Sequence, residues 1–156
     1  MTLNPVVHDE LSIERTLKAS PDRVFAAWAD PAKKRLWFAQ GEPFVLEVFE
    51  ADFREGGFER SRFRLKGGPE MTNETYYHEI VENRRIIQSY GMTLGDKRIS
   101  VSLATLELEP VGDGTRLKFT EQAAFLEGSD GVDRRRDGWN VLLDRLTTLL
   151  AGGELR

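Results

Sequence analysis

Six strand-like segments follow one another between Phe44 and Phe125 and are separated only by short turns. The turns are marked by glycine, proline, asparagine and aspartate, residues that favour tight changes of chain direction. They are REGG (54–57), KGGPE (66–70), ENRR (82–85), LGDK (94–97) and VGDG (111–114). Because a parallel connection needs a dozen or more residues, turns this short allow only antiparallel pairing. The sequence therefore predicts an antiparallel meander.

One further strand and three helices flank this meander. Residues 10–19 alternate as a strand, and the sequences Ser20-Pro21-Asp22 and Asp30-Pro31 are typical starts of short helices. After the meander, apolar residues recur with helical spacing and form one stripe. The stripe comprises Trp139, Leu142, Leu143, Leu146, Leu149 and Leu150. The order β-α-α-β6-α predicts an α+β fold, a curved antiparallel seven-stranded sheet around a long C-terminal helix. Gly138 is expected to let this helix approach a neighbour closely.

Length and composition indicate one domain, 1–156, with a structured core at about 8–152. A net charge of −4 gives no general attraction to nucleic acid. The absence of cysteine excludes disulfides, thiolate nucleophiles and iron–sulfur ligation. The basic run 134–136 is flanked by acidic residues and is expected to form a solvated helix face.

Several classes of site and location are disfavoured. The only histidines, His8 and His78, have no metal-ligand spacing, and neither phosphate-binding glycine motifs nor G-x-S-x-G occur. We therefore expect no cofactor and no metal. No apolar run approaches a membrane span, and the N-terminus lacks the features of a signal peptide, so we expect a cytoplasmic protein without membrane insertion.

Glu121 is a charged residue on an otherwise apolar strand face. Alternation in the segment 117–125 puts it on the same side as Phe119. A four-residue loop at VGDG places Ala104 opposite Glu121 and Ser102 nearby. Because these neighbours are small and an unpartnered buried charge is costly, the pattern predicts a cavity into which Glu121 projects.

Arg15 is the lone ionic residue on one face of the first strand. We hypothesise that Arg15 and Glu121 both project into the cavity and orient the polar group of a ligand. In the alternative interpretation, each residue reaches solvent past a strand end or makes a structural ion pair.

Three further residues are candidates for the cavity wall. His78 carries an imidazole, which suits proton transfer, and a four-residue turn at ENRR places it opposite Ser89. Tyr77 lies on the opposite face of the same strand, and the pattern leaves open which face is the inner one. Trp139 on the helix stripe either lines the cavity or belongs to the core, which is the more common use of such an aromatic residue.

Five segments carry a resemblance to a known superfamily. They are SIERTLKASPDRVFAAWADPAKKRLWF (12–38), D-F-R-E-G-G (52–57), G-T-R-L (114–117), T-E-Q-A-A-F (120–125) and G-W-N-V-L-L-D-R-L (138–146). In this order they resemble the START-like, birch-pollen-allergen-like (SRPBCC) superfamily. The match is closest to small bacterial members of the branch that resembles the activator of Hsp90 ATPase.

The resemblance implies a helix-grip fold with a hydrophobic pocket between the sheet and the last helix. It also implies a leading function, the binding of a small hydrophobic lipid-like or polyketide-like ligand. A second reading is a polyketide cyclase or aromatase with Glu121 as acid or base, and a third is a co-chaperone domain acting on Hsp90. A homodimer and a chaperone partner both stay open, as do the identity of the ligand and the presence of any catalysis.

Overall fold

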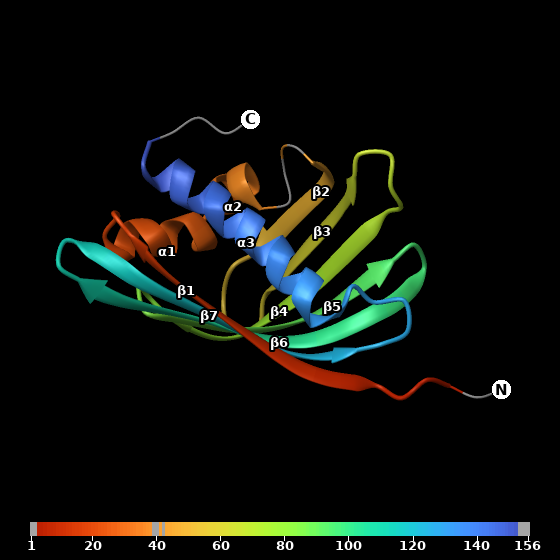
Figure 1. Ribbon diagram of the computed structural model, residues 1–156. Coiled ribbons are helices and arrows are strands. Elements are labelled where there is room, and N and C mark those ends of the chain that lie inside the picture. Colours follow the sequence, from red (N-terminus) through yellow and green to blue (C-terminus); the bar gives the residue numbers. More distant parts are fainter. Residues whose placement is uncertain (1–2, 39–40, 42, 153–156) are drawn as a thin grey trace.

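The protein was analysed as a computed structural model that describes residues 3–38, 41 and 43–152 (Figure 1). The order of elements is the predicted one: a strand, two helices, six strands and a final helix. The first part comprises β1 (Val7–Leu17), α1 (Pro21–Ala29) and α2 (Pro31–Trp37). The meander comprises β2 (Phe44–Asp52), β3 (Phe58–Leu65), β4 (Met71–Val81), β5 (Arg85–Leu94), β6 (Lys97–Val111) and β7 (Gly114–Phe125). The last helix is α3 (Gly131–Leu150).

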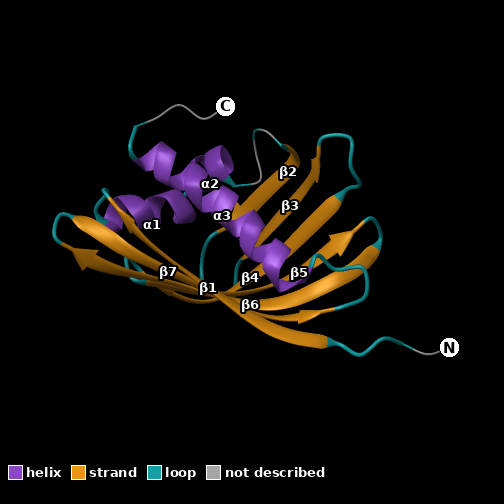
Figure 2. Cartoon of the chain, in the orientation of Figure 1, coloured by secondary structure: helices purple, strands orange, loops and turns teal. Residues whose placement is uncertain are grey.

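The strands form one antiparallel seven-stranded sheet with the order β1-β7-β6-β5-β4-β3-β2. The predicted meander is thus confirmed, and β1 joins it beside β7. The sheet is curved, and all three helices lie on its concave side, with α3 running across it (Figure 2). The predicted α+β fold is therefore present, with the helix-grip architecture that the family resemblance implies.

The β6–β7 pairing has the predicted register. Leu106 faces Phe119, and Ala104 faces Glu121. Since side chains alternate along a strand, Glu121 shares the concave face with Phe119, two residues before it. Both residues are buried.

The register of β4 and β5 differs from the predicted one. The turn holds three residues, 82–84, rather than four, and an irregularity between Tyr77 and Glu79 shifts the pairing by one residue. As a result Tyr76, and not His78, faces Ser89. His78 is exposed, on the same face of β4 as the exposed Glu74 and Tyr76, and its side chain lies outside the core.

The turn before β3 shows why the D-F-R-E-G-G segment contains two glycines. Gly56 has a φ of 80°, a conformation that glycine adopts without steric cost. At Gly57 an added Cβ would lie 2.1 Å from the carbonyl oxygen of Asp52, so no larger residue fits. This tight turn joins β2 to β3 and is structural.

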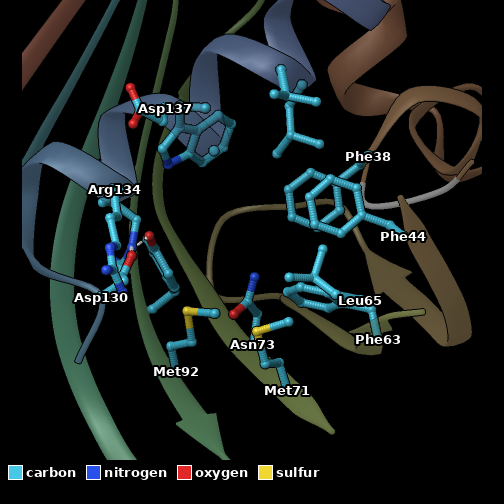
Figure 3. Close-up of a pocket in the computed structure, with 16 residues that line it drawn as sticks. Phe38, Phe44, Phe63, Leu65, Met71, Asn73, Met92, Asp130, Arg134 and Asp137 are labelled. Atoms are coloured by element: carbon cyan, nitrogen blue, oxygen red, sulfur yellow. Dashed lines mark hydrogen bonds and ion pairs between the residues drawn. The ribbon is translucent and has the colours of Figure 1, made fainter. Parts of the chain in front are cut away.

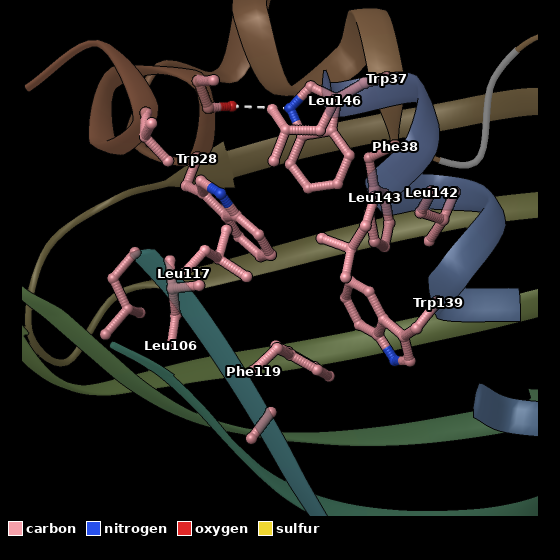
Figure 4. Packing of buried hydrophobic residues seen from close by; sticks show 14 of the residues in the cluster. Trp28, Trp37, Phe38, Leu106, Leu117, Phe119, Trp139, Leu142, Leu143 and Leu146 are labelled. Carbon is pink, nitrogen blue, oxygen red and sulfur yellow. Dashed lines mark hydrogen bonds between the residues drawn. The ribbon is translucent and has the colours of Figure 1, made fainter. Parts of the chain in front are cut away.

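A cluster of large aromatic side chains fills the space between α3, the short helices and the β6–β7 part of the sheet (Figure 4). The ring of Phe119 lies 4.1 Å from that of Trp139, centroid to centroid, and Trp28 lies 6.2 Å from Trp139. Leu143 and Leu146 on α3 are completely enclosed. Burial of each such leucine stabilises the fold by about 1.5–3 kcal/mol. This part of the concave side is therefore solidly packed.

Candidate ligand-binding site

A cavity of about 340 Å³ lies between α3 and the concave face of the other half of the sheet (Figure 3). Its size falls at the small end of the range of about 300–1,000 Å³ for ligand sites. The wall is formed by Phe38, Phe44, Phe63, Leu65, Met71, Asn73, Tyr90, Met92, Asp130, Arg134, Arg135, Asp137, Gly138, Trp139, Val141 and Leu142. The sheet contributes β2, β3, β4 and β5, and α3 contributes the opposite wall.

The wall is mainly apolar, and its rim is partly exposed. Leu65 at the end of β3 is 44% exposed, and Val141 on α3 is 40% exposed. Arg134 and Asp137 on α3 are exposed as well. Solvent therefore reaches the cavity past the edge of α3. The exposed charged residues Arg134 and Asp137 lie at this opening.

Gly138 is one reason why the cavity is open. If a Cβ were added to it, no heavy atom would lie within 4 Å. The expectation that Gly138 brings α3 close to a neighbour is therefore wrong, since the missing side chain borders empty space. The first half of α3 therefore borders the cavity. The leucine side chains of its second half fill the corresponding space there.

Behind the cavity wall, Glu121 is 1% exposed and is held by four side chains. The Tyr90 hydroxyl lies 2.8 Å from both carboxylate oxygens, and the Ser102 hydroxyl donates at 2.8 Å. The Arg135 guanidinium donates at 2.7 Å, and the Trp139 indole N–H donates at 2.9 Å. The carboxylate is therefore fully partnered without a ligand.

Arg135 supplies the counter-charge of Glu121 and is 5% exposed. Its Nε and Nη2 donate to the two carboxylate oxygens of Asp130 at 2.7 and 2.8 Å. Nη2 also donates to the Ser100 hydroxyl, and Nη1 donates to the Tyr90 hydroxyl and to Glu121. These contacts engage all five N–H groups of the guanidinium. Arg135 therefore has no donor left for another molecule.

This network shifts the pKa values of three of its members. Burial, and then the neighbouring Glu121 carboxylate, raise the pKa of Tyr90 well above its usual range, so that the phenol stays protonated. Burial alone would lower the pKa of Arg135, but its contacts with Tyr90, Asp130 and Glu121 raise it above its usual value. Partial burial opposes the ionisation of Asp130, yet the hydrogen bonds and charge of Arg135 lower its pKa.

The expected partnership of Arg15 with Glu121 is absent. Nη1 of Arg15 donates to Asp144 on α3 at 2.6 Å, and Nη2 donates to the side-chain oxygen of Asn140 at 3.0 Å. Arg15 faces Leu117 in the sheet, several residues from Glu121, and thus fastens β1 to α3. Its ion pair is structural, as the alternative interpretation held.

The basic run 134–136 was expected to be a solvated helix face, and this expectation is wrong at its centre. Arg134 and Arg136 do point outwards, but Arg135 points into the fold. The burial of Arg135 could have been predicted from helical spacing. Arg135 stands four residues before Trp139 and so extends the apolar stripe of α3 by one turn.

Of the residues expected to line the cavity, Trp139 is part of its wall. Glu121, Phe119, Ala104 and Ser102 are buried on the far side of Trp139 and are not part of this wall. The space that the small residues Ala104 and Ser102 leave is occupied by the side chains of Arg135, Tyr90 and Trp139 around Glu121.

The remaining two candidates from the sequence lie on opposite faces of β4. His78 is exposed, and its Nε2 lies 2.7 Å from the Ser89 hydroxyl. Tyr77 is buried and donates to Glu59 at 2.8 Å, while Glu59 pairs with the buried Lys34 of α2 at 2.6 Å. The inner face of β4 is thus the one that carries Tyr77. This second buried ion pair connects α2 with β3 and is separate from the cavity wall.

Two kinds of feature are absent from the part of the chain that the structure describes. No group of three or more histidine, aspartate or glutamate residues there is placed to hold a metal ion. None of the described helices is long and apolar enough to cross a membrane.

Comparison with known proteins identifies relatives of the same architecture. Residues 18–151 match the family described as activator of Hsp90 ATPase homolog 1-like protein. No curated protein matches the sequence.

Three similar solved structures come from bacteria. The Mll3558 protein from Rhizobium loti is 46% identical, with 93% of this chain and 99% of that one covered and a TM-score of 0.85. An uncharacterised protein from Rhizobium leguminosarum is 41% identical, with 96% and 99% covered and a TM-score of 0.90. The CV1439 protein from Chromobacterium violaceum is 26% identical, with 90% and 96% covered and a TM-score of 0.78. These similarities support the fold and the family and supply neither a ligand nor a reaction.

Proposed function

Because the chain belongs to the activator of Hsp90 ATPase homolog 1-like family, whose solved relatives share its architecture, we propose that it binds one small apolar molecule in the cavity beneath α3. The observation that carries the proposal is the cavity itself, about 340 Å³ in volume. Its apolar wall would release ordered water when an apolar ligand enters, which favours binding.

The size of the cavity narrows the ligand class. A space at the low end of the range for ligand sites suits a fused-ring molecule or a short aliphatic chain rather than a diacyl lipid. Within the lipid-like and polyketide-like classes suggested by the sequence, the smaller members are therefore the best candidates.

The experiment compares the protein with a variant whose cavity is blocked. Gly138→Phe adds a large ring at a position that lines the cavity, and Gly138→Ala is the matched control because it adds only a methyl group, which would have no heavy atom within 4 Å. Titration calorimetry and native mass spectrometry with small aromatic and short-chain aliphatic molecules are expected to show a one-to-one complex. Affinity should fall at least tenfold in Gly138→Phe and stay nearly unchanged in Gly138→Ala. Equal binding by all three proteins, or binding by none, would contradict the proposal.

The position of Glu121 gives no support to a cyclase-type reaction. Its carboxylate lies behind Trp139 and already accepts hydrogen bonds from four side chains. A group that acts as acid or base must come within hydrogen-bonding distance of the reacting atom. A co-chaperone action on Hsp90 is attached to the family name alone, and no observation on the described residues favours it.

A further inference from the structure

The floor of the cavity carries a polar side chain without a partner. Asn73 on β4 lines the cavity and is 8% exposed. Its carbonyl oxygen Oδ1 is buried and has no hydrogen-bond partner among the described residues. Figure 3 shows the Asn73 amide directed into the space between the sheet and α3.

A second unpaired polar group lies beside it. Ser61 on β3 faces Asn73 across the sheet, so the two side chains point to the same side. Ser61 is 3% exposed, and its hydroxyl oxygen has no hydrogen-bond partner among the described residues either. Leaving buried polar atoms unpaired destabilises a fold, and such atoms are rare in native proteins. Of the two residues only Asn73 lines the cavity, so its amide is the group whose hydrogen bonds another molecule can complete.

The surroundings of Asn73 favour an uncharged partner. Arg135, the buried cation of the wall, has all its donors engaged, and Asp130 is held by Arg135. Arg134 and Asp137 are exposed at the mouth of the cavity. A charged ligand group placed at Asn73 would consequently be desolvated without a counter-charge, which is very costly.

We propose that Asn73 receives the hydroxyl group of the ligand, which makes the ligand class a small apolar alcohol or phenol that enters the cavity with its hydroxyl group first. The proposal rests on the proposed function and specifies its ligand. The ligand O–H donates to Oδ1 of Asn73 once the side-chain amide has rotated to turn this buried oxygen towards the cavity. The ring or chain of the ligand then occupies the space between α3 and the methionine and phenylalanine side chains of the sheet.

Three probes of nearly equal shape test this assignment by titration calorimetry. 2-Naphthol both donates and accepts, 2-methoxynaphthalene only accepts, and 2-methylnaphthalene does neither. An apolar cavity alone would favour 2-methylnaphthalene, because a hydroxyl group must lose its water to enter. We expect the protein to bind 2-naphthol about tenfold more tightly than the other two probes, the effect of about one hydrogen bond. In Asn73→Leu, where the side chain is apolar and of similar size, this preference should disappear.

The outcomes separate the two proposals. If the three probes bind with equal affinity and Gly138→Phe blocks them all, the hydroxyl assignment is overturned and the cavity proposal stands. A preference for 2-naphthol that persists in Asn73→Leu also overturns the assignment. Binding of none of the probes counts against both proposals. The comparison of probes on the unmodified protein needs no variant, so it decides the question even if Asn73→Leu fails to fold.

Discussion

At the scale of single residues, the fold depends on a buried ion pair whose members come from different elements. Glu121 lies on β7 and Arg135 on α3, and both side chains are almost completely buried. Removing one member of such a pair leaves a buried charge without compensation, which usually costs about 3–5 kcal/mol. Removing both members together costs much less, because no charge is left behind.

Arg135→Met is therefore expected to lower the free energy of unfolding by about 3–5 kcal/mol, as measured by urea denaturation. The double variant Arg135→Met with Glu121→Leu should be more stable than Arg135→Met alone. Arg136→Met is the control, since Arg136 makes only an exposed ion pair with Asp133, and its loss should change stability by less than about 1 kcal/mol. Similar losses for Arg135→Met and Arg136→Met would show that the pair is not buried in solution.

A second prediction concerns the pH dependence of the same network. Because Arg135 lowers the pKa of Asp130 in the folded protein, the Asp130 contribution to stability is present above the ordinary pKa of an aspartate. It is lost as the pH falls through the lowered pKa, when Asp130 takes up a proton. Asp130→Asn should thus cost about 1 kcal/mol at pH 7, and this difference should shrink below about pH 4. Denaturant titrations at several pH values measure this difference in the free energy of unfolding between the unmodified protein and Asp130→Asn. A difference that stays constant down to pH 3 would contradict the assignment.

Sequence patterns predict that Glu121 lies on a buried strand face, but they do not identify its counter-charge. Alternation in β7 shows that a carboxylate lies on the buried face, and the hairpin register gives its neighbours on β6. The counter-charge comes from a helix, and packing between a helix and a sheet is not encoded in local periodicity. Arg135 could still be suspected, because it stands one turn before Trp139 on the apolar stripe. Because Arg134 and Arg136 flank it, the run was interpreted as a solvated helix face instead.

At the scale of elements, α3 combines a tightly packed half with an open half. Leu142, Leu143 and Leu146 are buried in the core, while Gly138 borders the cavity. Glycine inside a helix is less favourable than alanine by about 0.5–1 kcal/mol, chiefly because its backbone loses more freedom on folding. Because Gly138 borders the cavity, close packing does not offset this loss of helix stability.

Gly138→Ala is consequently expected to stabilise the protein by about 0.5–1 kcal/mol, because the added methyl group meets no other atom. Thermal and urea unfolding measure the change. A destabilised variant would show that α3 approaches the sheet at this point more closely than described, and that the cavity is smaller.

The strands and turns were predictable to a large extent, for physical reasons. Five clusters of turn residues divide the meander correctly, because glycine and asparagine are needed wherever the backbone reverses tightly. The bulge at His78 was not predictable, since one extra residue in a strand leaves no trace in composition. It shifts the pairing partners across β5, whereas alternation with the buried Asn73 and Thr75 already places Tyr77 inwards and His78 outwards.

At the scale of the whole molecule, the concave side of the sheet is divided into a packed half and an open half. Trp28, Phe119 and Trp139 fill the half over β6 and β7, and the cavity lies over β2, β3, β4 and β5. The family resemblance implies a cavity between the sheet and the last helix, and the pattern around Glu121 predicted it over β6 and β7, which is not the half of the sheet that the cavity occupies. The correct half is not predictable from the sequence, because it depends on how large side chains from distant segments share the space.

Trp139 belongs to both halves, since its ring lines the cavity while its indole N–H is held by Glu121. A molecule inside the cavity would contact the Trp139 side chain, whose indole N–H stays bound to Glu121. The other two tryptophans, Trp28 and Trp37, lie outside the cavity wall. Trp139 can therefore serve as an intrinsic fluorescence probe of ligand binding. Quenching or a spectral shift of its emission would show that the cavity is occupied, without any attached dye.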